Sequence, residues 1–139
     1  MNKSVLFCGP SGSGKTTIVH HLLKANPQLS FSVSATTRPK RNNETDGFDY
    51  HFLSVEEFKK RIAADEFIEW EEVYKDRFYG TLKSEIEKIW AQNKAVLFDV
   101  DVEGGLNIKN KLQGNLLAVF IQPPSLDELH RRLRERNTE

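Results

Sequence analysis

The sequence is poor in cysteine, in net charge and in long hydrophobic runs. Cys8 is the only cysteine, so no disulfide can form within the chain. Lysine plus arginine number 20 and aspartate plus glutamate number 20, so no overall field favours nucleic acid or an anionic membrane. No apolar stretch approaches a membrane span, and no signal-peptide pattern follows Met1. These absences predict a cytoplasmic protein without nucleic-acid or membrane partners, and they leave its oligomeric state open.

What the sequence does contain suits a single domain. It has 139 residues, of which 38% are hydrophobic and 29% are charged, enough for one core and a polar surface. No repeat, low-complexity tract or linker interrupts it. The histidines lack metal-ligand spacing with the cysteine, so no zinc site is predicted and solvated positions are expected for them. They are His20, His21, His51 and His130.

The most informative motif is a phosphate loop, GPSGSGKT, at residues 9–16, between an apolar run and a helical pattern. Its glycines allow backbone N–H groups to close around phosphates where a Cβ would obstruct them. Lys15 adds a movable cation, and Thr16 adds a hydroxyl ligand for Mg²⁺. The pattern predicts binding of a nucleotide's phosphates together with Mg²⁺. The predicted phosphate-binding residues are Gly9, Pro10, Ser11, Gly12, Ser13, Gly14, Lys15, Thr16 and Thr17.

Short apolar runs alternate with helical patterns along most of the chain. The runs have the composition of strands buried on both faces of a parallel sheet, and they lie at 5–8, 95–100 and 116–121. Amphipathic stripes typical of helices lie at 18–23, 82–90 and 126–133. Asn26-Pro27 should end the first helix, and capping boxes at 54–57 and 125–128 should open others, the former running to about Ala64. The alternation predicts an α/β fold.

Residues 31–79 interrupt this rhythm. Residues 32–34 are predicted to be a strand and 38–47 a polar loop, while 48–53 alternate and 67–70 form a short aromatic-rich run. Small strands that carry polar and aromatic groups, inserted in a nucleotide-binding core, indicate a module for a second substrate.

Residues 31–52, FSVSATTRPKRNNETDGFDYHF, closely resemble the GMP-binding region of guanylate kinases. The resemblance continues in order and spacing through FIEW, YGT, FDVD and PPS, which begin at residues 67, 79, 98 and 123. It implies an ATP:GMP phosphotransferase with a P-loop kinase core, a parallel sheet flanked by helices. The implied parts are a core at 1–30 and 82–125, a small mixed-β GMP-binding module at 31–81 and the start of a lid at 126–139.

The resemblance also implies roles for individual residues. Guanine presents two N–H donors side by side, and the resemblance gives Glu69 the carboxylate that accepts both. Ser34 resembles the hydroxyl that serves guanine O6, with Thr81 nearby and Asp101 close to the bound nucleotide. The implied cluster around the acceptor phosphate combines guanidinium forks with phenol donors. It consists of Arg38, Arg41, Tyr50 and Tyr79.

Asp99 ends an apolar strand, where the second acidic motif of phosphate-loop enzymes reaches the metal directly or through water. Asp101 should alternate onto the same face, although a strand-end cap is the alternative for either aspartate. Thr16 and Asp99 are therefore the predicted Mg²⁺ ligands, Asp99 through water. Lys15 of the phosphate loop is predicted to neutralise the transferred phosphoryl group, and the resemblance implies the same role for Arg38, Arg132 and Arg136.

The sequence departs from the family pattern in three places. Glu103 stands where glutamine is more usual, Asn137 interrupts the usual Arg-Gly-Thr, and the chain ends at Glu139, where relatives continue through the rest of the lid. We therefore expect a chain that lacks the C-terminal part, binds both nucleotides and transfers phosphate poorly. Two alternatives remain. Intact Lys15 and Thr16 oppose a phosphopeptide-binding scaffold module, and Glu69 with Ser34 would distinguish this protein from other P-loop small-molecule kinases.

Overall fold

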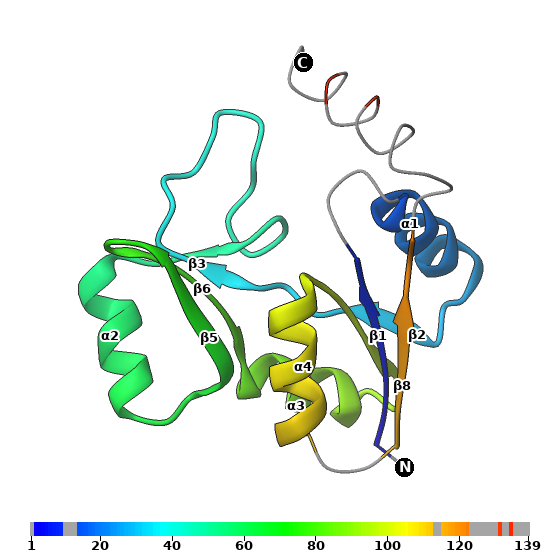
Figure 1. The fold of residues 1–139 in the computed structure, drawn as a ribbon. Helices are drawn as coiled ribbons and strands as arrows, with labels where there is room; N and C mark the ends of the chain where they lie inside the picture. Colours follow the sequence, from blue (N-terminus) through cyan, green and yellow to red (C-terminus); the bar gives the residue numbers. More distant parts are fainter. Residues whose placement is uncertain (1, 10–13, 113–114, 123–130, 132–133, 135–139) are drawn as a thin grey trace.

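The computed structural model describes residues 2–9, 14–112, 115–122, 131 and 134. Two four-stranded sheets dominate this part of the chain (Figure 1). The predicted α/β fold, with a parallel sheet flanked by helices, is confirmed. The predicted lid and the capping box at 125–128 lie outside the described residues, apart from residues 131 and 134.

The first sheet is parallel and is called the core sheet here. Its strands follow the order β2-β7-β1-β8, and they are β1 (Lys3–Cys8), β2 (Leu29–Phe31), β7 (Ala95–Val100) and β8 (Asn115–Phe120). Its helices are α1 (Lys15–Ala25), α3 (Lys83–Ala91) and α4 (Val102–Lys111). Leu6 and Phe7, adjacent on β1, are both buried, in clusters on opposite faces of the sheet. Burial of both faces explains the continuous apolar runs in the sequence.

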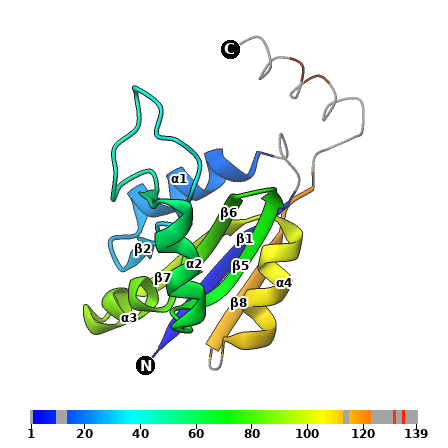
Figure 2. The ribbon, with the colours of Figure 1, turned by 90° about the vertical axis from the view of Figure 1, so that its left-hand side faces the viewer.

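The second sheet, together with α2, forms a unit called the module here. Its strand order is β4-β3-β6-β5, and only the β3–β4 pair is parallel. The elements are β3 (Ala35–Thr36), β4 (His51–Phe52), α2 (Val55–Ala63), β5 (Phe67–Tyr74) and β6 (Arg77–Leu82). Viewed from the module side, α2 lies in front of β5 and β6 (Figure 2). Its Phe58 stacks on Phe67 and Phe78, with ring centroids 4.4 and 5.1 Å apart.

Helix boundaries follow the predicted signals closely. The Ser54 hydroxyl accepts a hydrogen bond from the Glu57 backbone N–H at 3.0 Å and opens α2, as the capping box predicted. Helix α1 ends at Ala25, just before Asn26-Pro27. Ile18, which was expected on the buried stripe of this helix, is exposed. No helix in the described ranges is long and apolar enough to cross a membrane.

The strand predictions between residues 31 and 79 need correction. Residues 32–34 are not a strand, because they cross from the core sheet to the module; Phe31 still pairs with Leu97 in the core sheet. The run that begins at Phe67 extends to Tyr74 and forms a hairpin with β6 that the sequence pattern did not reveal. Helix α4 was also not foreseen. It packs against β5 as well as β1, β7 and β8, and so joins the module to the core.

Candidate active site

The phosphate loop connects β1 to α1, with its residues Pro10, Ser11, Gly12 and Ser13 outside the described residues. Gly14 precedes the helix at φ +96°, a left-handed conformation that a side chain would strain. The first turn of α1 holds no acidic residue, so the partial positive charge of the helix N-terminus is not neutralised there. Thr16 and Thr17 are exposed in this turn. This end of the helix is suited to an anion.

Lys15 reaches back to the carboxyl ends of two core strands. Its Nζ lies 3.0 Å from Asp99 Oδ1 and donates hydrogen bonds to the carbonyls of Val100, at 3.1 Å, and Gly9, at 3.4 Å. Strands β1 and β7 are paired in parallel up to Cys8 and Val100. The cation and the carboxylate therefore meet at the edge of the sheet where parallel α/β folds bind ligands.

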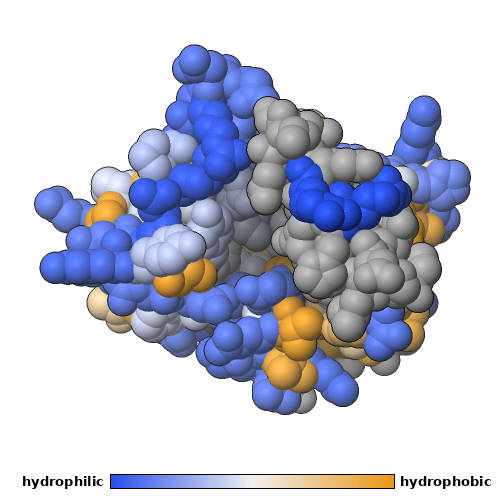
Figure 3. All heavy atoms as spheres, turned by 45° about the horizontal axis from the view of Figure 1, so that its top comes forward, coloured by the Kyte–Doolittle hydropathy of each residue, from blue (hydrophilic) through white to orange (hydrophobic). Residues whose placement is uncertain are grey.

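A cleft of about 420 Å³ separates this edge from the module. Four residues of the core line it, namely Asp99, Val100, Asp101 and Gly104. Ser34 of the segment that crosses to the module also lines it, and the module contributes Tyr50, Glu69, Glu71, Val73, Tyr79 and Gly80. Figure 3 shows the molecule hollowed at its centre, where the described residues of the rim are mostly hydrophilic. The structure thus brings six of the predicted site residues to one cleft.

Glu69 is the buried acid of the cleft. It lies on β5 opposite Thr81 of β6, is 6% exposed, and its Oε1 accepts a hydrogen bond from the Thr81 hydroxyl at 3.0 Å. Burial raises the pKa of Glu69 to about 7, and the negative charges of Glu71 and Asp101 add to this effect. Within the described residues, Oε2 has no hydrogen-bond donor. The Thr81 hydroxyl thus holds the carboxylate through Oε1, while Oε2 and the second lone pair of Oε1 can accept from a ligand.

Asp101 has a structural role at the edge of this cleft. Its Oδ1 accepts a hydrogen bond from the Gly104 backbone N–H at 2.7 Å and caps α4. Strand β7 ends at Val100, so Asp101 does not alternate along the strand with Asp99 as expected. A Cβ on Gly104 would lie 3.1 Å from the capping oxygen and 3.7 Å from Glu69 Oε2. The absence of a side chain at this position keeps the cleft open beside Glu69.

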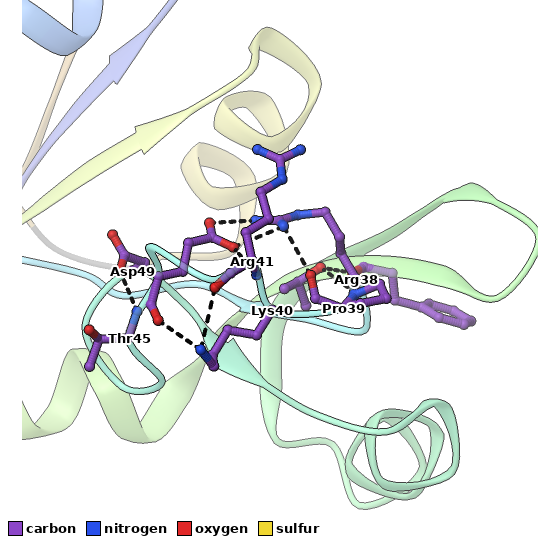
Figure 4. A network of polar contacts seen from close by, with 9 residues as sticks. Arg38, Pro39, Lys40, Arg41, Thr45 and Asp49 are labelled. Carbon is purple, nitrogen blue, oxygen red and sulfur yellow. Dashed lines mark hydrogen bonds and ion pairs between the residues drawn. The ribbon is translucent and has the colours of Figure 1, made fainter.

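The predicted phosphate-binding cluster is only partly assembled. The Tyr50 and Tyr79 rings meet edge to face, 6.1 Å apart, and Arg38 Cζ lies 5.2 Å from the Tyr50 centroid. Burial raises the pKa of Tyr50, which keeps its phenol a neutral donor. In Figure 4 no dashed line reaches the Arg41 guanidinium group. The Arg41 side chain is exposed and does not line the cleft.

Sequence reasoning missed Glu44, which binds Arg38 through two hydrogen bonds. In Figure 4 these are among the dashed lines that leave the labelled Arg38. The available signal was an acidic residue close to arginines in a loop predicted to bind an anion. The expectation for His51 was wrong, because it is half-buried and its Nε2 lies 3.1 Å from Glu85 Oε2. His20 and His21 are exposed as expected, while His130, Arg132 and Arg136 lie outside the described residues.

Comparisons with known proteins agree with this arrangement. The sequence profile of one family, described as guanylate kinase, matches residues 1–139. The guanylate kinases of Bacteroides fragilis and Salinibacter ruber are 56% and 57% identical to this chain and match 99% and 97% of it. The match covers 67% and 71% of those proteins.

A solved structure of a guanylate kinase also matches this chain. The crystal structure of guanylate kinase from Anaplasma phagocytophilum matches with a TM-score of 0.76 at 31% identity, over 94% of this chain and 65% of that one. The chain therefore spans about two thirds of the length of the relatives that it matches.

Proposed function

This chain belongs to the guanylate kinase family, and from that premise we propose that the protein transfers the γ-phosphoryl group of ATP to GMP, giving ADP and GDP. The observation that carries the proposal is the cleft between the core sheet and the module. A buried carboxylate, Glu69, faces it from one side, and the strand ends that hold Lys15 face it from the other. We place the reaction in the cytoplasm.

The base end of the cleft suits guanine. The N1–H and N2–H₂ donors of guanine lie side by side, and the ionised carboxylate of Glu69 can accept from both. The Thr81 hydroxyl orients this carboxylate by donating to Oε1, and Ser34, which also lines the cleft, can bond O6. Adenine carries a lone pair at N1, which the same carboxylate would repel. A buried acceptor left without its donor is the kind of mismatch that gives strong discrimination.

The other end of the acceptor site suits a phosphate. Tyr50 and Tyr79 line the cleft and provide neutral donors, while Arg38 lies against the Tyr50 ring. Arg41 adds a second guanidinium group from the same loop. A dianionic phosphate is recognised well by such a combination, because guanidinium N–H groups form short charge-assisted hydrogen bonds.

On the donor side, Lys15 and the N-terminus of α1 receive the ATP phosphates. Among the described residues no group of three or more acidic, histidine or cysteine side chains could hold a metal. Mg²⁺ keeps several waters and takes most of its other ligands from the nucleotide. Thr16 and, through water, Asp99 would hold Mg²⁺, and the bound ion would neutralise charge on the phosphates. The protein then contributes alignment and charge, chiefly through Lys15, with Arg132 and Arg136 as further predicted contributors.

Replacement of Lys15 by alanine tests this function. We expect Lys15→Ala to lower turnover at least about 100-fold, because the cation that neutralises the phosphoryl group is lost, while GMP affinity stays within a few-fold. A coupled assay of ADP formation and calorimetric titration of GMP measure the two quantities. Lys24→Ala, which removes an exposed lysine from the last turn of the same helix, is the matched control. Unchanged turnover in Lys15→Ala would refute the assignment.

A further inference from the structure

We propose that Glu44 is a positioning residue for the acceptor phosphate. It binds the Nη1 and Nη2 end of the Arg38 guanidinium group and so orients the edge that carries Nε and Nη2 towards the ligand. Glu44 belongs to the loop that joins β3 to β4, which projects from the module in Figure 1. The inference rests on the proposed function, since it names a further residue of the same acceptor site.

The Glu44 carboxylate makes an unusually complete set of contacts for a loop residue. Its Oε2 accepts from Arg38 Nη2 at 2.7 Å, and its Oε1 accepts from Arg38 Nη1 at 3.0 Å. Oε1 also accepts from the Arg41 backbone N–H at 2.9 Å. The two side chains are only 12% and 13% exposed. A parallel pair of charge-assisted bonds fixes the angle of the guanidinium plane as well as its position.

This arrangement leaves a defined set of donors on Arg38. Nη1 gives its two hydrogens to Glu44 and to the Pro39 carbonyl, the latter at 3.1 Å. Nη2 uses one hydrogen for Glu44. Glu44 and Pro39 do not use the second hydrogen of Nη2 or the Nε–H, and these two donors lie side by side on one edge of the planar group. The Tyr50 phenol, which lines the cleft, also forms a hydrogen bond with Arg38. Two parallel donors are what a phosphate binds best.

Two aromatic rings lie next to the same group, on one side of it. Arg38 Cζ lies 5.2 Å from the Tyr50 centroid and 5.8 Å from the Phe52 centroid, and these two rings are 5.7 Å apart. Tyr50 lines the cleft, so the ring that supports Arg38 also borders the ligand. Glu44 at the end of the guanidinium group and the two rings beside it restrict the positions that the group can take.

The pairing divides the work between the two arginines. Hydrogen bonds from Arg38 hold the pKa of Glu44 down at about 2, so the pair carries no net charge at neutral pH. Arg38 therefore serves mainly as an oriented donor. The Arg41 guanidinium has no ion pair among the described residues, and it brings the uncompensated positive charge that attracts the phosphate.

A positioning role for Glu44 and a simple effect of its charge predict opposite changes in the GMP affinity of Glu44→Gln. Glu44→Gln removes a negative charge near an anionic ligand, so charge alone would make GMP bind more tightly. If Glu44 positions Arg38, the variant should instead bind GMP more weakly. The single oxygen of glutamine can accept from only one guanidinium nitrogen, so the Arg38 side chain can rotate. A loss of one to two charge-assisted hydrogen bonds corresponds to about 10-fold to 100-fold in affinity. Guanosine, which has no phosphate, should bind the variant as it binds the wild type.

The experiment is calorimetric titration of GMP and guanosine into wild type, Glu44→Gln, Arg38→Ala and the double variant. We expect Glu44→Gln to weaken GMP alone, and to weaken it no further when Arg38 is already alanine. Asp49→Asn is the matched control, because Asp49 accepts from the Thr45 backbone N–H at 2.7 Å in the same loop without binding an arginine. It should leave both affinities unchanged.

Three results would overturn the inference. They are equal or tighter GMP binding by Glu44→Gln, an equal loss for guanosine, and a further loss in the Arg38→Ala background. The last two would mean that Glu44 only maintains the loop. If the wild type bound neither ligand, the proposed function itself would fail, and the inference would fall with it.

Discussion

Glu69 shows what a single residue contributes to recognition and what it costs in stability. A buried carboxylate is costly when ionised unless partners compensate it, and here Thr81 alone donates to it among the described residues. The pKa of Glu69 is about 7 in the folded chain, above its ordinary value of 4.5. The folded state therefore binds the proton more tightly than the unfolded state. Stability from this group is present below pH 4.5 and is lost as the pH rises towards 7.

Glu69→Gln should therefore stabilise the chain in the absence of ligand at alkaline pH. Glutamine keeps an oxygen for the Thr81 hydroxyl and removes the buried charge. We expect a gain of about 1 to 2 kcal/mol at pH 8, less than the full pKa shift because the cleft admits water. The gain should disappear near pH 4.5. Thermal or urea unfolding measures it, with Glu87→Gln on the exposed face of α3 as the control. A destabilised variant at pH 8 would contradict this account.

The same carboxylate should make guanine binding depend on pH. Only the ionised form accepts from both guanine donors, so binding must release the proton that Glu69 carries below pH 7. We expect guanosine affinity to fall by up to about tenfold for each pH unit below 7. Guanosine is the better probe, because the phosphate of GMP titrates near pH 6. Glu69→Gln should bind weakly with no such dependence, whereas a pH-independent wild type would show that the carboxylate does not bind the base.

At the scale of elements, the module depends on one helix and three aromatic rings. Phe58 of α2 is fully buried and stacks on Phe67 of β5 and Phe78 of β6. These two strands also carry Glu69 and Tyr79 to the cleft. Packing of these three rings between α2 and the sheet thus fixes the positions of the strands that carry Glu69 and Tyr79.

Truncation of Phe58 should therefore destabilise the module whose strands carry the acceptor-site residues. We expect Phe58→Ala to lower the free energy of unfolding by about 3 to 5 kcal/mol, the usual cost of a cavity that replaces a buried phenylalanine. Phe48→Ala, at a position that is 75% exposed, should change it by less than about 0.5 kcal/mol. Urea denaturation measures both. Equal effects of the two substitutions would be inconsistent with a core centred on Phe58.

Local signals predicted some elements and not others, for physical reasons. The ends of α1 and α2 follow from Asn26-Pro27 and from the Ser54 cap, because capping depends on neighbouring residues. Helix α4 begins at Val102 and carries Gly104-Gly105 in its first turn, so its composition does not indicate a helix. Residues 32–34 have strand-like composition, but the Val33 N–H bonds a side-chain oxygen of Glu85 at 3.3 Å instead of a neighbouring strand. Partners distant in sequence decide such cases.

Some residues of the candidate site were likewise predictable from local sequence, and others were not. The phosphate loop and Asp99 were predictable because local motifs and strand ends define them. The roles of Ser34, Glu69 and the tyrosines were predicted from family resemblance, and the cleft brings these residues together. The pair of hydrogen bonds between Glu44 and Arg38 was not predictable, because it depends on the path of a loop that has no regular periodicity.

At the scale of the whole molecule, the chain crosses between the two sheets at residues 32–34 and again at the end of β6. Glu85, in the first turn of α3, stands beside the first crossing. It is buried, accepts from the Val33 backbone N–H, and lies 3.1 Å from His51 Nε2 on β4. Ser34, next to Val33, lines the cleft. One core side chain therefore holds two parts of the module in place.

Removal of Glu85 should loosen the module without affecting the donor site. We expect Glu85→Ala to destabilise the chain by about 1 to 3 kcal/mol, because the Val33 N–H loses its acceptor, and to weaken GMP binding several-fold. ATP affinity should not change, since α1 and the strand ends that hold Lys15 lie elsewhere on the core sheet. Hydrogen exchange should quicken at Val33 and His51 but not in β1. Glu87→Ala, two residues along the same helix and exposed, is the control. Parallel losses of GMP and ATP binding would show that the two sheets respond as one rigid unit.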